Sequence, residues 1–369
     1  MVTHVVAPSL RLPNLGNTCY ANAVFQLLAA SPSFRDNLRS EDDADDEARR
    51  RGLVGADDRT ALASALLAAT RELIVDGRSD RTKSVLRRFA AMTTRSGFRV
   101  HDSNDAQEFL VLFLELLRAS STRGFRLANK PDNFENPSVR DMMKANWDAE
   151  IGASFFSPLA CLQSQYLSET RCGNCSYATH SAQVHTVLPV SPRSTIETSV
   201  AEFFADEGVE DWRCDRCGEK HPDTRKKMWL WRPSRVLVLN VTRFLPDGRK
   251  DATPVSASDF LDLTPFCASG ARRPPRVRYG LRAVVDHTGR GRAGGHYTCD
   301  AMRVRDTVAE DDAENVTVRR ITWDRLDDDD EAVGGGASRR GNSTSYLLLY
   351  EAYIAERYTF ENQNGTPHR

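Results

Sequence analysis

Four of the eight cysteines stand in two C-x2-C pairs, Cys172 with Cys175 and Cys214 with Cys217. Two thiolates three residues apart in a tight turn can bind one side of a tetrahedral ion, and a second such turn completes a four-cysteine zinc site. Gly173 and Gly218 offer the backbone freedom that these turns use. The alternative is two unrelated pairs of surface thiols. Because a site with four protein ligands is closed, the predicted Zn²⁺ is structural and not catalytic.

Composition narrows the classes of protein that this chain can belong to. The 50 basic and 51 acidic residues leave a formal net charge of −1, which argues against a nucleic-acid partner. Eight cysteines in 369 residues are too few for a disulfide scaffold. The N-terminus does not resemble a signal peptide, and no apolar run is long enough to span a membrane. We therefore expect an intracellular protein, cytoplasmic or nuclear, without a membrane partner.

The hydrophobic pattern changes along the chain. Up to about Ser121 it is helical, and one run repeats at helical spacing through Phe109, Leu112, Phe113, Leu116 and Leu117. From about Leu159 onward, β-branched and alternating segments predominate: Val184–Val190, Arg235–Phe244, Tyr279–Asp286, His296–Arg303 and Tyr346–Tyr353. The polar stretches 40–58, 119–137 and 331–345 separate these segments. A helical first third followed by a β-rich remainder predicts an α+β fold.

Cys19 differs from the other thiols in its position. It precedes a helical run that we expect to start near Ala21, and a helix N-terminus stabilises a thiolate. The alternative is a capped, buried cysteine. We interpret the three remaining thiols as buried small hydrophobic residues: Cys161, Cys267 and Cys299.

A reactive thiolate needs a base, and that base needs a group to orient it. His296, in a Gly-Gly-His-Tyr segment, is the leading candidate because the glycines leave its imidazole accessible. His287 ends an apolar run and is interpreted as a packed or turn histidine. A downstream segment ends in the acidic run 327–331, from which one carboxylate could orient the imidazole.

Several segments together resemble the ubiquitin-specific proteases, a family of papain-like cysteine deubiquitinases. GNTCYANAVFQLL is similar to the cysteine box of that family, and HDSNDAQEFLVLFLELL to its DAQEF helix. RPSRVLVLNVTRF, YGLRAVVDHTGRGRAGGHYTC and YLLLYEAY resemble a palm strand, the histidine box and the terminal strand. The segments follow the family order and span residues 10–353.

The resemblance implies roles for the catalytic candidates. Cys19 would be the nucleophile and His296 the general base. Asp327 would orient His296, and the neighbouring Asp328 is the alternative third member. Asn14 would complete the oxyanion hole with the backbone N–H of Cys19, and an Asx-turn cap is its alternative role.

The resemblance also implies a binding site for the tail of ubiquitin. Asp105, Gln107 and Glu108 open the DAQEF helix, and a carboxylate there would pair with an arginine of that tail. Favourable interaction of first-turn carboxylates with the helix dipole is a sufficient structural explanation by itself.

The implied architecture is one hand-like catalytic domain over 10–356, with a short tail at 357–369. A helical thumb would cover about 10–150, zinc-bearing β fingers 155–230, and a β palm 231–356. The implied reaction is hydrolysis of the bond after the C-terminal glycine of ubiquitin, without a cofactor for catalysis. Ubiquitin and ubiquitinated proteins are the expected partners of an expected monomer. The alternatives are an inactive ubiquitin-binding scaffold and an isopeptidase for a ubiquitin-like modifier.

Overall fold

The structure is a computed structural model. It describes residues 10–50, 58–94, 97–119, 138–152, 156–270, 276–291, 294–311, 314–328, 330, 333–334 and 340–353.

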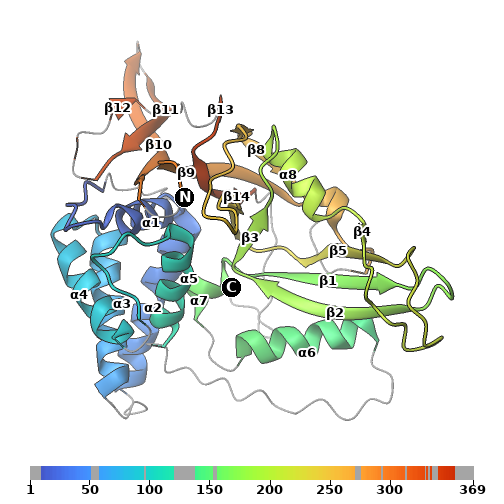
Figure 1. The fold of residues 1–369 in the computed structure, drawn as a ribbon. Helices are drawn as coiled ribbons and strands as arrows, with labels where there is room; N and C mark the ends of the chain where they lie inside the picture. The colour runs from blue at the N-terminus through green and yellow to red at the C-terminus, as the bar shows by residue number, and fades with distance from the viewer. Residues whose placement is uncertain are drawn as a thin grey trace.

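The first part of the chain forms a group of helices that we call the thumb (Figure 1). Its elements are α1 (Cys19–Ala29), α2 (Pro32–Arg50), α3 (Asp58–Ile74), a 3₁₀ turn η1 (Ser79–Arg81), α4 (Thr82–Thr93) and α5 (Ala106–Arg118). The short helix α7 (Ser157–Ala160) packs beside α2 and α5. The acidic part of 40–58 therefore continues a helix as far as Arg50.

A four-stranded antiparallel sheet, the fingers sheet, extends away from the thumb (Figure 1). Its order is β2-β1-β5-β4, with bounds Ala178–His185, Ser164–Arg171, Arg225–Arg232 and Glu207–Gly208. Helix α6 (Val139–Gly152) covers one face of this sheet, where Met143 packs with Leu167 and Trp229. Sequence analysis missed this helix and placed its residues at the end of the thumb.

A larger sheet, the palm sheet, has the order β12-β11-β10-β9-β14-β6-β3, with β8 paired to β9. Its strands are β3 (Val187–Val190), β6 (Val236–Val241), β8 (Phe260–Asp262), β9 (Arg278–Thr288), β10 (His296–Asp311), β11 (Glu314–Leu326), β12 (Val333–Gly334) and β14 (Ser345–Ala352). The remaining elements near it are α8 (Ile196–Phe203), β7 (Val255–Ser256), η2 (Thr264–Phe266) and β13 (Arg340–Asn342). β3, from within the range predicted for the fingers, pairs in parallel with β6.

The palm sheet is buried on both faces, which explains why its central strands are continuous apolar runs. Val238 and Leu347 join the core that includes the thumb helices. Their neighbours Leu239 and Leu348 point to the opposite face and pack in a second cluster with α8. Alternate residues of the same strand therefore attach the sheet to the thumb on one side and to α8 on the other.

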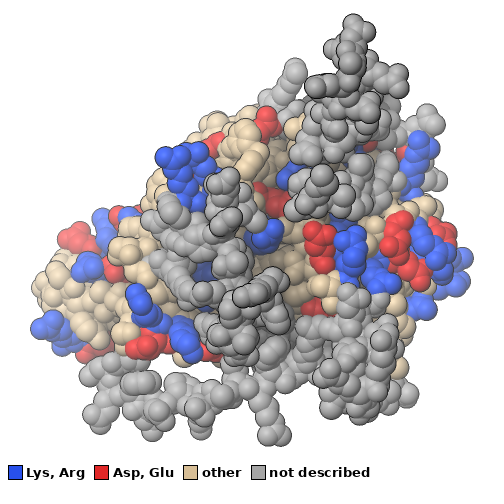
Figure 2. Space-filling model, turned by 180° about the vertical axis from the view of Figure 1, so that it is seen from behind, with Lys and Arg blue, Asp and Glu red and all other residues tan. Residues whose placement is uncertain are grey.

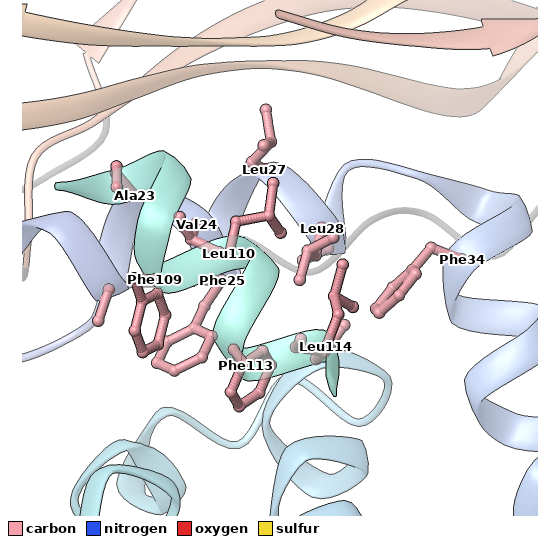
Figure 3. Packing of buried hydrophobic residues seen from close by; sticks show 14 of the residues in the cluster. Ala23, Val24, Phe25, Leu27, Leu28, Phe34, Phe109, Leu110, Phe113 and Leu114 are labelled. Carbon is pink, nitrogen blue, oxygen red and sulfur yellow. The ribbon is translucent and has the colours of Figure 1, made fainter. Parts of the chain in front are cut away.

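The thumb core is built between α1 and α5 (Figure 3). Phe25 of α1 contacts Phe109 and Phe113 of α5 edge to face, with ring centroids 5.6 and 5.3 Å apart. Leu110 and Leu114 complete the buried face of α5, whereas Leu112 and Leu116 are only half-buried. The helical period was predicted correctly, but the buried stripe is centred one residue away from the predicted one.

Charges of both signs lie side by side on the face seen in Figure 2. This distribution agrees with the net charge of −1. Within the described ranges, no helix combines the length and the apolar character that crossing a membrane requires.

Candidate active site and metal centre

Cys19 is the first residue of α1, two positions before the predicted helix start. The helix begins there because the N–H groups of Ala21 and Asn22 both donate to the carbonyl of Thr18 at 3.0 Å. The thiol therefore lies in the first turn, near the positive end of the helix dipole. Only 8% of the residue is exposed.

The loop before Cys19 is held by side-chain hydrogen bonds. Oδ1 of Asn14 accepts from the N–H groups of Gly16 and Thr18, at 3.2 and 3.1 Å. Nδ2 of Asn17 donates to the carbonyl of His101, and Asn17 adopts a left-handed backbone with φ of 54°. The oxygen of Asn14 thus forms the local cap that was the alternative prediction, and its NH₂ group points elsewhere.

His296, at the start of β10, lies between Cys19 and Asp327. Its Nε2 is 2.5 Å from Oδ1 of Asp327, which leaves Nδ1 for the Cys19 side chain. Hydrogen bonding with Cys19, followed by that with Asp327, raises the pKa of His296 to about 9 despite partial burial. The imidazole is therefore positively charged at neutral pH.

Asp328 faces a different set of partners. Its Oδ2 accepts from Nδ2 of Asn14 at 2.9 Å, and its Oδ1 accepts from Nδ2 of Asn22 at 2.8 Å. Its φ of 48° turns the two neighbouring carboxylates in different directions. His296, Asp327 and Asp328 approach one another closely enough to hold an ion, but these hydrogen bonds already account for their proximity.

A narrow hollow of about 20 Å³ adjoins Cys19. Thumb residues including Asn17 and Asn104 line one side, and palm residues including Gly294 and Gly295 line the other. A side chain at Gly295 would collide with Nε2 of His287 and with the carbonyl of Thr288. Residue 295 must therefore be a glycine, and the palm side of the hollow is bare backbone at this position.

His287 is packed behind this hollow, as predicted, with 2% exposure. Burial, together with the charge of Lys250, lowers its pKa to about 4. It is neutral at physiological pH and contacts Phe244 and Tyr297 through its ring.

Asp105 is the N-cap of α5. Its Oδ1 accepts from the N–H groups of Gln107 and Glu108, at 2.8 and 3.1 Å. Its Oδ2 accepts from the hydroxyl of Tyr346 at 2.5 Å, which links the thumb to strand β14 of the palm. Glu108 is exposed and Gln107 half-buried.

A buried charge cluster supports the strands behind the site. Arg325 of β11 lies 3.8 Å from Asp286 of β9 and 3.7 Å from Asp300 of β10, and both carboxylates are buried. Arg325 also donates to Oγ1 of Thr298. Since Asp327 follows Arg325 by two residues, this cluster fixes the end of β11, directly before Asp327.

The four paired cysteines converge at the tip of the fingers. Their Sγ atoms lie within 4.8 Å of one another, with Cys172 3.8 Å from Cys217 and Cys175 3.6 Å from Cys214. A tetrahedral ion with Zn–S bonds of about 2.3 Å separates its ligands by about 3.8 Å, so the set fits Zn²⁺. These separations are far too long for disulfide bonds.

The surroundings of the cysteine cluster fit thiolate ligands. The backbone N–H groups of Cys175 and Asn174 lower the pKa of Cys172 to about 7. The N–H of Tyr177 lowers the pKa of Cys175, but burial and the three other thiols outweigh it and raise that pKa to about 11. A side chain at Gly173 would clash with His221 and Asp223, so a close approach requires this glycine, whereas Gly218 has a positive φ of 72°. Cys161, Cys267 and Cys299 are buried away from the cluster, as predicted.

Sequence analysis missed three residues of this arrangement: Asn22, Arg325 and Tyr346. Asn22 is separated from Asp328 by 306 residues and Tyr346 from Asp105 by 241. No local pattern indicates such pairs. The sequence signal that could have singled out Asn22 is an amide side chain in a largely apolar helical segment, which it shares with Gln26.

The family model described as ubiquitin carboxyl-terminal hydrolase matches residues 10–350. Ubiquitin carboxyl-terminal hydrolase 17-like protein B of Mus musculus is 25% identical over 300 residues, which cover 79% of this chain and 56% of that protein. Ubiquitin carboxyl-terminal hydrolase 4 of Eremothecium gossypii is 24% identical over 332 residues, which cover 79% of this chain and 38% of that protein.

The chain spans about half the length of the first of these curated relatives. Among solved structures, the fold is similar to a chain of the SAGA Ubp8/Sgf11/Sus1/Sgf73 DUB module bound to ubiquitin aldehyde, with a TM-score of 0.64. That match has 16% sequence identity and covers 95% of this chain and 72% of the other. It supports the predicted fold class of thumb, fingers and palm.

Proposed function

Because the chain belongs to the ubiquitin carboxyl-terminal hydrolase family, we propose that it is a thiol-dependent deubiquitinase. It hydrolyses the isopeptide or peptide bond after the C-terminal glycine of ubiquitin. The observation that carries the proposal is the arrangement of Cys19, His296 and Asp327, contributed by the thumb, by palm strand β10 and by the residue that follows β11. Ubiquitin and ubiquitinated proteins are its substrates.

Cys19 is the nucleophile in this proposal. In this proposal the attacking form of Cys19 is the thiolate, paired with the protonated imidazole of His296. The Sγ atom attacks the carbonyl carbon of the terminal glycine, and His296 gives its proton to the leaving lysine amine. Neutral His296 then takes a proton from the water that hydrolyses the thioester.

Asp327 holds the imidazole in orientation, since its Oδ1 is the partner of Nε2. Asp328 holds Asn14 instead, through the hydrogen bond at 2.9 Å. The second N–H of that amide and the backbone N–H of Cys19 meet the negative charge that develops on the scissile carbonyl oxygen. The two neighbouring carboxylates thus serve the base and the oxyanion hole separately.

The hollow between Asn17 and Gly295 receives the glycine tail of ubiquitin, because its volume of about 20 Å³ suits a narrow segment without side chains. Glu108, an exposed carboxylate in the first turn of α5, is the proposed contact for an arginine of that tail. Asp105 uses both its oxygens to cap α5 and to bind Tyr346, and Gln107 remains a candidate contact. Four thiolates hold a structural Zn²⁺ that stiffens the fingers for binding the globular part of ubiquitin.

The division into thumb, fingers and palm is part of the same proposal. Two segments modify the predicted boundaries: α6 packs on the fingers sheet, and β3 pairs with palm strand β6. The cleft between thumb and palm carries the chemistry.

We expect the purified chain to release the fluorophore from ubiquitin–7-amido-4-methylcoumarin and to form one covalent adduct with a ubiquitin C-terminal electrophile. Peptide mapping should place the adduct on Cys19. Binding of ubiquitin without an adduct would favour an inactive scaffold. Reaction only with probes built on a ubiquitin-like modifier would favour an isopeptidase for that modifier.

Asp327→Asn is expected to shift the pH profile. In the wild type, kcat/KM should fall as pH rises through about 9, where His296 loses its proton. Removing the carboxylate lowers the pKa of His296 toward its usual value, so the fall should begin at a lower pH, with activity at pH 7.5 reduced about 100-fold or more. Profiles measured with the coumarin substrate test this.

Asp330→Asn, an exposed position in the same acidic run, is the matched control and should leave the profile unchanged. A shifted alkaline limb for Asp328→Asn, with Asp327→Asn unaffected, would contradict the assignment of Asp327.

A further inference from the structure

A hollow of about 320 Å³ lies on the thumb, separate from the hollow beside Cys19. Its floor is apolar and is made by Leu15, Leu86, Ala90 and Val100. Its remaining lining residues are Lys83, Arg87 and His101. The volume is within the range that accommodates a bulky side chain and its neighbours.

One face of α4 builds this hollow. Lys83, Leu86, Arg87 and Ala90 recur at helical spacing, next to the stripe that buries Val85 and Phe89 in the core. Lys83 and Arg87 are exposed, and neither forms an ion pair with another described residue. Two cations without an ion pair among the described residues, over an apolar floor, are complementary to a bulky apolar side chain flanked by carboxylates.

The hollow is joined to the catalytic loop. Leu15 follows Asn14 directly, and the carbonyl of His101 accepts the hydrogen bond of Asn17. Asn17 lines the hollow beside Cys19, so the two hollows lie on either side of one short connection. A molecule whose reacting bond is at Cys19 can therefore reach the α4 hollow with an adjacent segment.

The position of α4 indicates which part of the bound molecule would reach the α4 hollow. Figure 1 shows α4 on the side of the thumb that faces away from the fingers sheet, with α2 and α5 toward that sheet. If ubiquitin lies on the fingers and palm, its tail reaches Cys19 from that side. The acceptor protein, from which ubiquitin is removed, then lies beyond the scissile bond, on the side of α4.

We infer that the α4 hollow binds the acceptor protein, through an apolar side chain flanked by Asp or Glu near the modified lysine. This inference rests on the proposed function and adds a preference for the protein on the leaving side of the bond. Electrostatic selection of this kind weakens as salt concentration rises.

Three conjugates of ubiquitin with a synthetic peptide, joined through a lysine side chain, test the inference. The first peptide carries Leu flanked by Asp and Glu, the second Leu flanked by Lys, and the third Ser flanked by Asp and Glu. We expect kcat/KM of the wild type to be about tenfold higher for the first than for either other peptide at low salt. Ubiquitin–7-amido-4-methylcoumarin, which has no acceptor peptide, reports the hydrolysis itself.

Variants of α4 separate the acceptor preference from the chemistry. Lys83→Glu/Arg87→Glu should reduce the preference below about twofold, and Ala90→Phe should abolish the advantage of Leu over Ser by filling the floor. Hydrolysis of the coumarin substrate should be retained by both. Arg140→Glu, the same change as Arg87→Glu at an exposed helix position on α6, should keep the full preference.

Equal kcat/KM for the three conjugates in the wild type would overturn the inference and leave the deubiquitinase proposal intact. A preference that survives Lys83→Glu/Arg87→Glu would overturn it as well. If the wild type fails to hydrolyse the coumarin substrate too, the proposed function itself falls, and the acceptor inference with it.

Discussion

Cys19→Ala is expected to reduce the hydrolysis of ubiquitin–7-amido-4-methylcoumarin by at least about 10⁴-fold. The reason is that the Sγ atom of Cys19 forms the bond to the substrate. Without it there is no nucleophile, and His296 alone cannot replace it. The affinity for ubiquitin should stay within about threefold, since the change removes one atom from a side chain that is already 8% exposed. Initial rates and fluorescence polarisation with labelled ubiquitin measure the two quantities.

Cys161→Ala is the matched control, because this second thiol is buried in the same core and lies outside the line of Cys19, His296 and Asp327. It should keep its activity and its labelling by the ubiquitin electrophile. Undiminished turnover by Cys19→Ala, or loss of labelling in Cys161→Ala alone, would refute the assignment of the nucleophile.

The parts of the site that the sequence predicted are carried by short segments. Cys19 and His296 stand in motifs whose neighbours, Asn14 and the two glycines before His296, lie within a few residues. Local chemistry of that kind is visible without a fold. The four-cysteine cluster was also predictable, because each thiol pair occupies a single turn and only the meeting of two turns depends on the tertiary structure.

Where two similar residues compete for one position, long-range contacts select between them, and the sequence alone does not predict the outcome. Asp327 and Asp328 are equivalent as a sequence, and the backbone at Asp328, with φ of 48°, decides which one faces His296. Asp105 looked like a ligand for a substrate arginine, yet Tyr346 on a distant strand takes one of its oxygens. The buried stripe of α5 was misplaced because Leu110 and Leu112 are equally apolar, and packing against Phe25 and its neighbours selects between them.

The fingers illustrate the same limit at the level of whole elements. α6 is amphipathic only weakly, with polar and apolar residues mixed, and it becomes a helix with a buried side because the fingers sheet offers Leu167 and Trp229 to Met143. The cation–π contact between Arg232 and Trp147 adds a second connection, with 4.2 Å from the guanidinium to the ring centroid. The fingers are thus supported by this helix at their base and by the cysteine cluster at their tip.

Cys214→Ser should therefore prevent the chain from binding its metal ion and should destabilise the tip of the fingers. Structural zinc in small zinc-binding peptides contributes about 10–16 kcal/mol of apparent binding free energy, so the loss of one of four thiolates should abolish stoichiometric binding. We expect about one zinc ion per wild-type chain and less than about 0.2 in the variant, by elemental analysis. The KM for ubiquitin–7-amido-4-methylcoumarin should rise about tenfold or more, while kcat changes little, because Cys19 and His296 are held by the thumb and palm cores.

Cys267→Ser is the control for this change, since Cys267 is buried in the palm cluster that packs against α8 and does not belong to the four-cysteine cluster. It should retain the zinc and the low KM, even if its melting temperature falls by a few degrees. Folded, active wild-type protein without zinc would contradict the assignment of the metal. A fall in kcat equal to the rise in KM would contradict the separation of zinc from chemistry, because the fingers would then have to position the catalytic groups as well as ubiquitin.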